Sequence, residues 1–485
     1  MATALTQVEA APATNAVQSL TLRACIERAL LNNLDIKLES LTPNIAAWGI
    51  TGAQGVFDPL LTGGVNYDEV RSPGSLTNSF SKLEQQQLGF NLGLSGKFAT
   101  GTGYNLTGYD TRTSGNGPFT AGGFVYAGGP ALTLTQPILK NFGFGPNTAQ
   151  IRMARKSYAA AGQQFVQQVI NTISDVNNAY YELIYAIDFH KSTLEDLSRA
   201  QALLDENSKR LKIGVMSPLD VVQAEAGVAE REEAVLLAAQ AITDSQNILI
   251  RLISQDVAEF RSVKLQPTDY PTFEAVDLDI ATNVRVAMEK RPDIAAARLN
   301  LERQNIFVKY NHNQLWPEVD LLGSIGWSGS ATSLSRLTDS VGSGDYPGWA
   351  VGVTVTFPIG NRQAKATYQS AKLQADQQVL ALKRLEQDII VSIDTITGRV
   401  QTNLKRIEAT RAASRLAAES LKAEEAKLRA GTSTSFTVLQ AQSQLALALS
   451  AEIRSRADYA KSLVELARTT GTTLDRQHIT LTGER

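Results

Sequence analysis

The stretch Leu211-Lys212-Ile213-Gly214 returns 217 residues later as Leu428-Arg429-Ala430-Gly431, at the end of a second long helical pattern. The same interval carries Val221-Val222-Gln223-Ala224 onto Val438-Leu439-Gln440-Ala441. A constant interval on both sides of a glycine turn indicates a duplication, because chance similarity between alanine-rich helices would not preserve the spacing. The chain is therefore predicted to contain two copies of one helical hairpin.

The segments that precede these hairpins repeat at a longer interval. Residues 29–36 share their pattern with residues 287–294, which lie 258 positions later, and Pro59 corresponds to Pro317. The two intervals differ by 41 residues, so this excess must lie in the strand-rich part of the first half. We interpret the chain as an N-terminal extension (1–19), a first repeat (20–253), a linker (254–273), a second repeat (274–472) and a C-terminal tail (473–485).

Each half is predicted to contain one very long helix. Residues 147–211 and 361–429 would span about 98 and about 104 Å at 1.5 Å per residue. Apolar residues recur along both at alternating steps of four and three, which is typical of a coiled-coil seam. Shorter helices are predicted over 22–51, 217–253, 280–313 and 434–470. The predicted stripes comprise Val169, Ile173, Val176, Tyr180, Leu183, Ile187, His190, Leu194, Leu197, Gln201, Leu204, Ser208 and Leu211, and then Ile390, Ile393, Val400, Leu404, Ile407, Leu421 and Leu428.

Between the helices the composition shifts to glycine, threonine and aromatic residues. Residues 349–357 alternate strictly, with apolar side chains on one face and Ala, Gly or Thr on the other. Nine residues with an aromatic at each end suit a tilted strand that crosses a membrane. A strand on a soluble core would alternate too, but the long flanking helices offer no obvious covering layer. We predict that regions 57–139 and 317–359 form a membrane β-barrel whose lipid-facing side chains include Trp327, Trp349, Val351, Val353, Val355 and Phe357.

The 41-residue excess contains a further hairpin pattern, near residues 88–94 and 102–109. This hairpin could add strands to the barrel or form an external loop, and the sequence does not decide between them. The sequence predicts about four strands per chain, whereas the smallest membrane barrels have eight. Such a sheet has two open edges, so we expect it to pair with copies of itself.

Composition excludes several classes of function. Lys and Arg number 46 against 48 Asp and Glu, so the chain lacks the basic excess that binding to nucleic acid requires. The three histidines are scattered, and no cluster has the spacing of metal ligands. Cys25 is alone, and the N-terminus shows no secretory signal, so we interpret the sequence as the mature chain. We predict no catalytic residues, no cofactor, no metal and no nucleic-acid partner: the protein is not expected to be an enzyme.

Several short motifs, in this order and partly duplicated, resemble the TolC family of outer-membrane efflux and secretion ducts. The resemblance covers nearly the whole chain, from about residue 20 to residue 473. Its motifs are the opening Leu20-Thr21-Leu22 with Ala29-Leu30 and Asn32-Asn33, then Phe57-Asp58-Pro59, Gln136-Pro137-Ile138-Leu139, Phe357-Pro358-Ile359, and the turns Gly214-Val215-Met216-Ser217 and Gly431-Thr432-Ser433-Thr434.

The resemblance implies a homotrimer with a twelve-stranded barrel in the outer membrane of a Gram-negative bacterium and a twelve-helix tunnel in the periplasm. It implies a passive exit duct for small molecules, ions or proteins, within a tripartite efflux pump or a type I secretion system. An inner-membrane pump and a periplasmic adaptor would be its partners. The tip turns that meet the adaptor would include Lys212, Gly214, Ser217, Arg429, Gly431 and Thr434.

The resemblance also implies a closed aperture at the helix tips. The family prototype narrows its tunnel with acidic residues just after the second tip, and the matching positions here are Thr437 and Gln440. Because both are neutral, Asp220, after the first tip, would supply the main acidic ring. Helix capping alone also explains an acidic residue at this place.

The predicted fold class is therefore mainly α with a membrane β-barrel, built as a trimeric channel-tunnel. Two alternatives remain: a periplasmic coiled-coil adaptor, and a structural protein without a transport channel. An adaptor would carry lipoyl-like and barrel modules instead of duplicated strand pairs. A purely structural coiled coil would lack the alternating strands with aromatic ends.

Overall fold

The computed structural model describes residues 16–73, 82–116, 120, 123–260, 263–270 and 278–480. Most of the predicted N-terminal extension (1–15), the end of the predicted tail (481–485) and parts of the predicted linker (261–262 and 271–273) lie outside these ranges. The helices are α1 (Leu22–Asn32), α2 (Leu34–Gln54), α3 (Phe144–Asn147), α4 (Ala149–Lys212), α5 (Pro218–Ile253), α6 (Ile280–Lys290), α7 (Pro292–Asn313), α8 (Leu334–Gly342), α9 (Arg362–Arg429), α10 (Ser435–Thr470) and α11 (Thr473–Arg476), with 3-10 turns η1 (Gly55–Phe57) and η2 (Val257–Phe260). The strands are β1 (Ala16–Leu20), β2 (Leu60–Pro73), β3 (Lys82–Lys97), β4 (Gly103–Gly115), β5 (Phe124–Pro137), β6 (Val263–Pro267), β7 (Glu318–Trp327), β8 (Gly329–Ala331) and β9 (Pro347–Thr356).

The chain divides into two compact units. The helical unit comprises residues 1–42, 162–295 and 383–485, and the sheet unit comprises residues 43–161 and 296–382. Both units draw on both halves of the chain, so they do not coincide with the predicted repeats. Among the described residues, none of the helices combines the length and the apolar character that a membrane span needs.

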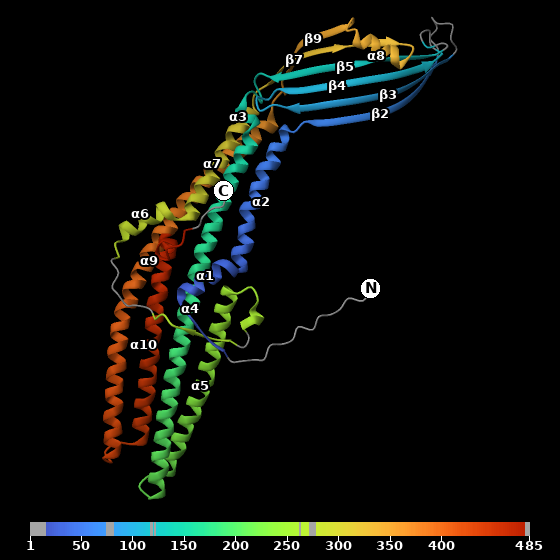
Figure 1. The fold of residues 1–485 in the computed structure, drawn as a ribbon. Coiled ribbons are helices and arrows are strands. Elements are labelled where there is room, and N and C mark those ends of the chain that lie inside the picture. The colour runs from blue at the N-terminus through green and yellow to red at the C-terminus, as the bar shows by residue number, and fades with distance from the viewer. Residues whose placement is uncertain are drawn as a thin grey trace, which may run out of the picture. The chain divides into compact units, whose positions relative to one another are not determined.

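The two predicted long helices are confirmed as α4, with 64 residues, and α9, with 68 residues. Each begins and ends within two residues of its predicted bounds. In the helical unit, α4 runs beside α5 and α9 runs beside α10, as two antiparallel hairpins (Figure 1). The two returning helices have equal lengths of 36 residues, as expected for duplicated hairpins.

The prediction of single helices over 22–51 and 280–313 was wrong, because each is broken once. The breaks fall at Asn33 and Arg291, where the backbone turns extended between α1 and α2 and between α6 and α7. These two positions are related by the same interval of 258 residues as the sequence repeat. At the second break, Pro292 also disfavours a helical conformation for the residue before it.

The side chain at each break holds the end of a hairpin helix. The Asn33 amide nitrogen donates to the Leu252 carbonyl oxygen at 3.0 Å, and the Arg291 guanidinium donates to the Thr469 carbonyl oxygen at 2.7 Å. Leu252 and Thr469 are themselves related by the interval of 217 residues. The duplicated sequence therefore folds into a duplicated contact, although the side chains that make it differ.

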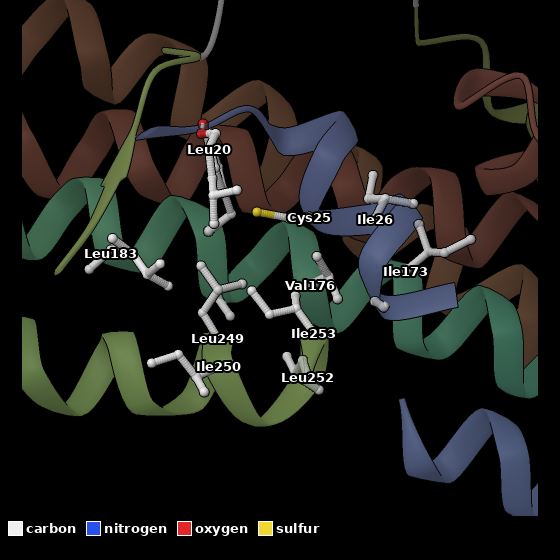
Figure 2. Packing of buried hydrophobic residues seen from close by; sticks show 14 of the residues in the cluster. Leu20, Cys25, Ile26, Ile173, Val176, Leu183, Leu249, Ile250, Leu252 and Ile253 are labelled. Carbon is white, nitrogen blue, oxygen red and sulfur yellow. Dashed lines mark hydrogen bonds between the residues drawn. The ribbon is translucent and has the colours of Figure 1, made fainter. Parts of the chain in front are cut away.

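The main core of the helical unit collects side chains from the end of β1 and from α1, α4 and α5 (Figure 2). Burial of each such aliphatic side chain contributes about 1.5–3 kcal/mol. The Cys25 thiol points into this core, where burial raises its pKa to about 12. The residues labelled in the figure are Leu20, Cys25, Ile26, Ile173, Val176, Leu183, Leu249, Ile250, Leu252 and Ile253.

The predicted stripe on α4 is confirmed only for its first part, Val169 to Leu183, whose five predicted members are all buried. Further along, burial passes to residues that precede the predicted ones by one position. At 3.6 residues per turn Asn207 lies about 180° from Tyr180, so the later part of α4 buries another face, toward residues of α9 and α10. On α9, the predicted residues Ile393, Val400, Leu421 and Leu428 are buried, whereas Ile390 is exposed and its neighbour Ile389 is buried instead. The residues buried along the later part of α4 are Asp196, Ala200, Leu203 and Asn207.

A short parallel pair of strands, β1 and β6, closes over the core and was not predicted. Tyr180, which is fully buried on α4, fastens it. The Tyr180 hydroxyl donates to the Leu20 carbonyl oxygen at 3.0 Å and accepts from the amides of Thr268 at 3.1 Å and Asp269 at 3.0 Å. One phenol therefore connects the long helix to both strand ends.

The sheet unit contains one antiparallel sheet with the strand order β2-β3-β4-β5-β7-β9, and the short strand β8 pairs with β5 (Figure 1). The predicted strand regions are confirmed, but the predicted count of about four strands is too low. Among the described residues, six long strands lie side by side, because the additional hairpin forms β3 and β4. Its alternation was ambiguous in the sequence, since glycines and the polar run Gln85–Gln87 interrupt it.

We expect Tyr180→Phe to lower the free energy of unfolding by about 1 kcal/mol, because the buried hydroxyl's hydrogen bonds to Leu20, Thr268 and Asp269 are lost. Thermal unfolding followed by circular dichroism in detergent measures this change. The control is Tyr158→Phe on the same helix, where the ring is 42% exposed. Equal unfolding midpoints for the two variants would mean that the phenol fills space but does not hold β1 and β6.

Candidate functional site

The first hairpin tip, between α4 and α5, is a glycine turn followed by a capping box. Gly214 has φ of +77°, the left-handed conformation that ends many helices. The Ser217 hydroxyl accepts from the Leu219 amide at 3.2 Å, and the Asp220 carboxylate accepts from the Ser217 amide at 3.3 Å. Pro218 occupies the first helical position, where no amide donor is needed. The start of α5 is thus fixed by local chemistry.

The second tip, between α9 and α10, has the same design with different residues. Gly431 has φ of +79°, and the Thr434 hydroxyl accepts from the Thr437 amide at 3.3 Å. The neighbouring Glu424 accepts from Lys427 at 2.6 Å and from the Ser433 hydroxyl at 2.8 Å. These two hydrogen bonds, that from Lys427 first, lower the pKa of Glu424.

The two tips are joined by a side chain that the sequence analysis did not single out. Asn207 is fully buried on α4, and its amide nitrogen donates to the Ser435 hydroxyl at 2.6 Å and to the Asp220 carbonyl oxygen at 3.4 Å. Asn207 therefore ties the first turn of α5 to the first turn of α10. The predicted heptad stripe had placed the neighbouring Ser208 on the buried face instead, one position later.

Further contacts hold the tips together. The Arg210 guanidinium donates to the Leu428 carbonyl oxygen at 3.0 Å and pairs with Glu206 at 2.9 Å, so it neutralises a partial negative charge at the end of α9. An apolar cluster packs behind it. Its buried members are Leu203, Leu421, Leu428, Val438, Ala441 and Leu445.

The predicted aperture residues lie at these helix starts. Asp220 is half-buried with its carboxylate used in the cap, the Thr437 hydroxyl lies 2.9 Å from that of Thr434, and Gln440 is exposed. The hydrogen bonds of Asn207 bring the starts of the two helices, and hence Asp220 and Thr437, into one region. The six predicted adaptor-contacting residues, Lys212, Gly214, Ser217, Arg429, Gly431 and Thr434, are all exposed.

A buried ionic cluster joins the same helices further from the tips. The Arg231 guanidinium, on α5, pairs with Asp196 of α4 at 2.8 Å, donates to the Gly227 carbonyl oxygen at 3.0 Å and donates to the Ser443 hydroxyl of α10 at 3.3 Å. Arg199 approaches the same carboxylate at 3.5 Å. A charged pair of this kind demands a fixed geometry, because removal of one partner leaves the other buried and uncompensated.

In the sheet unit, one face of the sheet carries an apolar row across all six long strands, and the same face also holds the charged residues Asp110 and Arg112 of β4. Directly opposed residues in antiparallel strands point to the same face. One row of such partners is entirely apolar, and the adjacent row, on the opposite face, is mostly small and polar. The first row is Leu61, Leu94, Leu106, Leu132, Ile325 and Trp349, and the second is Leu60, Ser95, Asn105, Thr133, Ser324 and Ala350.

The predicted lipid-facing residues all belong to this apolar face or to its border. Trp349, Val351, Val353 and Val355 lie on β9 and are each more than 60% exposed. Trp327 ends β7 opposite Pro347, and Phe357 follows the last residue of β9. This face gives the chain a broad apolar surface of the kind that marks an interface with lipid or protein.

Helix α8 lies over part of the apolar face. Its apolar residues recur at helical spacing, and Leu337 among them is buried. Together with β2 to β5 the helix lines an apolar hollow of about 700 Å³, to which Val65, Phe90 and Leu92 contribute. Leu94 and Leu106 are not among its lining residues, so they lie on the part of the face that α8 leaves open.

No group of histidine, cysteine, aspartate or glutamate side chains that could hold a metal ion occurs in the described part of the chain. The site consists instead of helix ends, a buried polar connection and a two-faced sheet. Such an arrangement can hold the helix tips in fixed positions and form the wall of a passage.

Comparison with known proteins gives one family. The model of the family described as "Outer membrane efflux protein" matches residues 104–255 and 283–472, more than half of the chain. The outer membrane protein OprJ of Pseudomonas aeruginosa is 26% identical over 68% of this chain and 67% of its own. The probable efflux pump outer membrane protein TtgC of Pseudomonas putida is 23% identical over 68% of this chain and 66% of its own length, slightly less than two thirds.

The fold is also that of a solved channel. The crystal structure of the Campylobacter jejuni CmeC outer membrane channel aligns with a TM-score of 0.70 and 18% identity. The alignment covers 93% of this chain and 86% of that one. The predicted fold class, mainly α with a strand-rich part as in the TolC family, is thereby confirmed.

We expect Arg231→Ala to destabilise the helical unit by about 3–5 kcal/mol, because Asp196 keeps its charge in a buried place without its main partner. The double variant Asp196→Leu with Arg231→Met should recover much of this loss. Thermal unfolding in detergent measures both. Glu232→Ala, an exposed neighbour on α5, is the control and should change little. An unchanged midpoint in Arg231→Ala would contradict a structural role for the cluster.

Proposed function

We propose that three copies of this chain form a passive exit duct through the outer membrane, because the chain belongs to the family of outer membrane efflux proteins. We also infer that the protein is not an enzyme. The observation that carries this proposal is the sheet with one apolar and one polar face. In a closed barrel the apolar face contacts lipid and the polar face lines a water-filled passage. Of the two alternatives, an adaptor would carry lipoyl-like and barrel modules, and a structural coiled coil would lack such strands.

Assembly follows from the edges of the sheet. Among the described strands, β2 and β9 each have one neighbour, so each leaves a row of backbone groups unpaired. Unpaired backbone groups are costly in a membrane, and pairing with further copies satisfies them. We infer a homotrimer, in accordance with the TolC-family resemblance, whose barrel closes only when all three chains are present.

The helical hairpins extend the duct into the periplasm in this proposal. Their exposed tips, from Lys212 to Ser217 and from Arg429 to Thr434, would meet a periplasmic adaptor protein, which connects the duct to an inner-membrane pump. The cargo comprises small molecules, ions or proteins. Among the similar proteins, TtgC is named a probable efflux pump outer membrane protein, OprJ an outer membrane protein and CmeC an outer membrane channel, which supports the proposed role.

The purified protein should insert into planar lipid bilayers as a trimer and produce discrete conductance steps. Chemical cross-linking in detergent should stop at three chains. The expected physical cause is closure of the sheet edges between copies. A monodisperse monomer in buffer without detergent, or protein that never conducts, would contradict the duct and favour an adaptor or a structural coiled coil.

We further propose that the aperture of the duct lies at the helix starts that Asn207 connects. Three copies of Asp220, Thr437 and Gln440 would surround one axis there. Asp220 is the acidic member, and three like charges in a narrow mouth concentrate the field and attract cations. The same carboxylate also caps α5, so the charge and the cap must be separated by experiment.

Asp220→Asn should reduce the cation preference of the channel, measured as the reversal potential in a salt gradient, because the acidic ring is lost. Thr437→Asp should increase it. Ser217→Ala is the matched control: it removes the cap, at a cost of about 1 kcal/mol, but leaves the carboxylate in place. If Ser217→Ala shifts the reversal potential as much as Asp220→Asn does, the effect comes from the helix start and the aperture lies elsewhere.

A further inference from the structure

We propose that the hairpin of β3 and β4 is part of the barrel wall, so that three copies, each giving six long strands, close an eighteen-stranded barrel. This inference rests on the proposed trimeric duct and specifies its passage. It replaces the twelve-stranded barrel that the family resemblance implies. The partner that each sheet edge binds is a second copy of this chain.

The pairing of the hairpin excludes its interpretation as an external loop. β3 pairs with β2 from Leu60 opposite Ser95 to Pro73 opposite Lys82, which is the full length of β2. On the other side, β4 pairs with β5 from Gly103 to Ser114. An external hairpin would leave β2 and β5 free to pair with each other, whereas here two complete strands separate them.

Along the two rows described above, the faces of the hairpin match those of the remaining sheet, whereas Glu84, Asp110 and Arg112 lie further along the strands on the face of Leu94 and Leu106. Leu94 of β3 and Leu106 of β4 occupy the apolar row that ends at Trp349, and they are 37% and 45% exposed in the single chain. Ser95 and Asn105 occupy the adjacent polar row. A loop in water has no need for this alternation, but a wall between lipid and water requires it.

The added strands would set the width of the passage and the charge of its wall. The diameter of a barrel grows roughly linearly with its number of strands, so eighteen strands give a passage about 1.5 times as wide as twelve. Charged residues are few on the polar face and lie mostly near the strand ends, namely Asp68, Lys97, Glu318 and Asp320. Such a wide and weakly charged passage admits bulky cargo without selecting it by charge, so selection is left to the helix tips.

The two edges of the sheet are suited to this closure. Successive neighbours in the sheet are all antiparallel, so among six strands the first and the last run in opposite directions. β2 of one copy can therefore form an antiparallel pair with β9 of the next. Three identical junctions of this kind complete the wall.

Single-cysteine variants test the position of the hairpin in the assembled trimer. In outer membranes, a maleimide that cannot cross lipid should label Ser95→Cys and Asn105→Cys from the passage. Labelling of Leu94→Cys and Leu106→Cys should stay at the background of the parent chain, because these sites face lipid. The parent thiol, Cys25, is buried with a pKa of about 12 and should not react at neutral pH.

A reference pair on β9 separates failure of this inference from failure of the duct. Thr354→Cys should be labelled and Val353→Cys should not, whether the barrel has twelve strands or eighteen. If the reference pair alternates but all four hairpin sites are labelled, the hairpin lies outside the wall and the inference is overturned. If the reference pair does not alternate either, or no trimer forms, the proposed duct itself is wrong.

Discussion

The constraint on which the helical unit depends is that one long helix, α4, packs against different partners along its length. Over its 64 residues α4 buries more than one face. Its first stripe, with Tyr180, packs into the core with α1 and α5, and its later stripe, with Asp196 and Asn207, turns toward α10. This change of partner explains why one helix contributes to an apolar core and also to the polar connections near the tips.

The sheet unit depends on the register in which its strands pair. Because side chains alternate strictly in a strand, the register of pairing decides which face is apolar, and a slip of one residue would exchange the two faces. The row from Leu61 to Trp349 shows that all six long strands keep one register. The broad apolar face and the open edges both support the proposed closure with further copies in a membrane.

The sequence predicted well those features that local chemistry determines. The ends of α4 and α9 and the starts of α5 and α10 follow from Gly214, Gly431, Ser217 and Thr434, whose capping bonds span a few residues. The helix break at Asn33 could not be predicted in this way, because its partner Leu252 lies 219 residues further along the chain. The bond between Asn207 and Ser435 was missed for the same reason, and the aperture and adaptor residues remain predictions.

In the proposed barrel, the added hairpin would change the number of strands without changing the helices. One additional strand would reverse the direction of one sheet edge, and antiparallel closure with a neighbouring copy would fail. A hairpin adds two strands, so β2 and β9 keep the directions that closure requires. Since β3 and β4 begin and end beside existing strands, the chain enters α4 as it would without them. Insertion of whole hairpins is thus the change in strand number that the sheet can accept while the duplicated helical hairpins stay as they are.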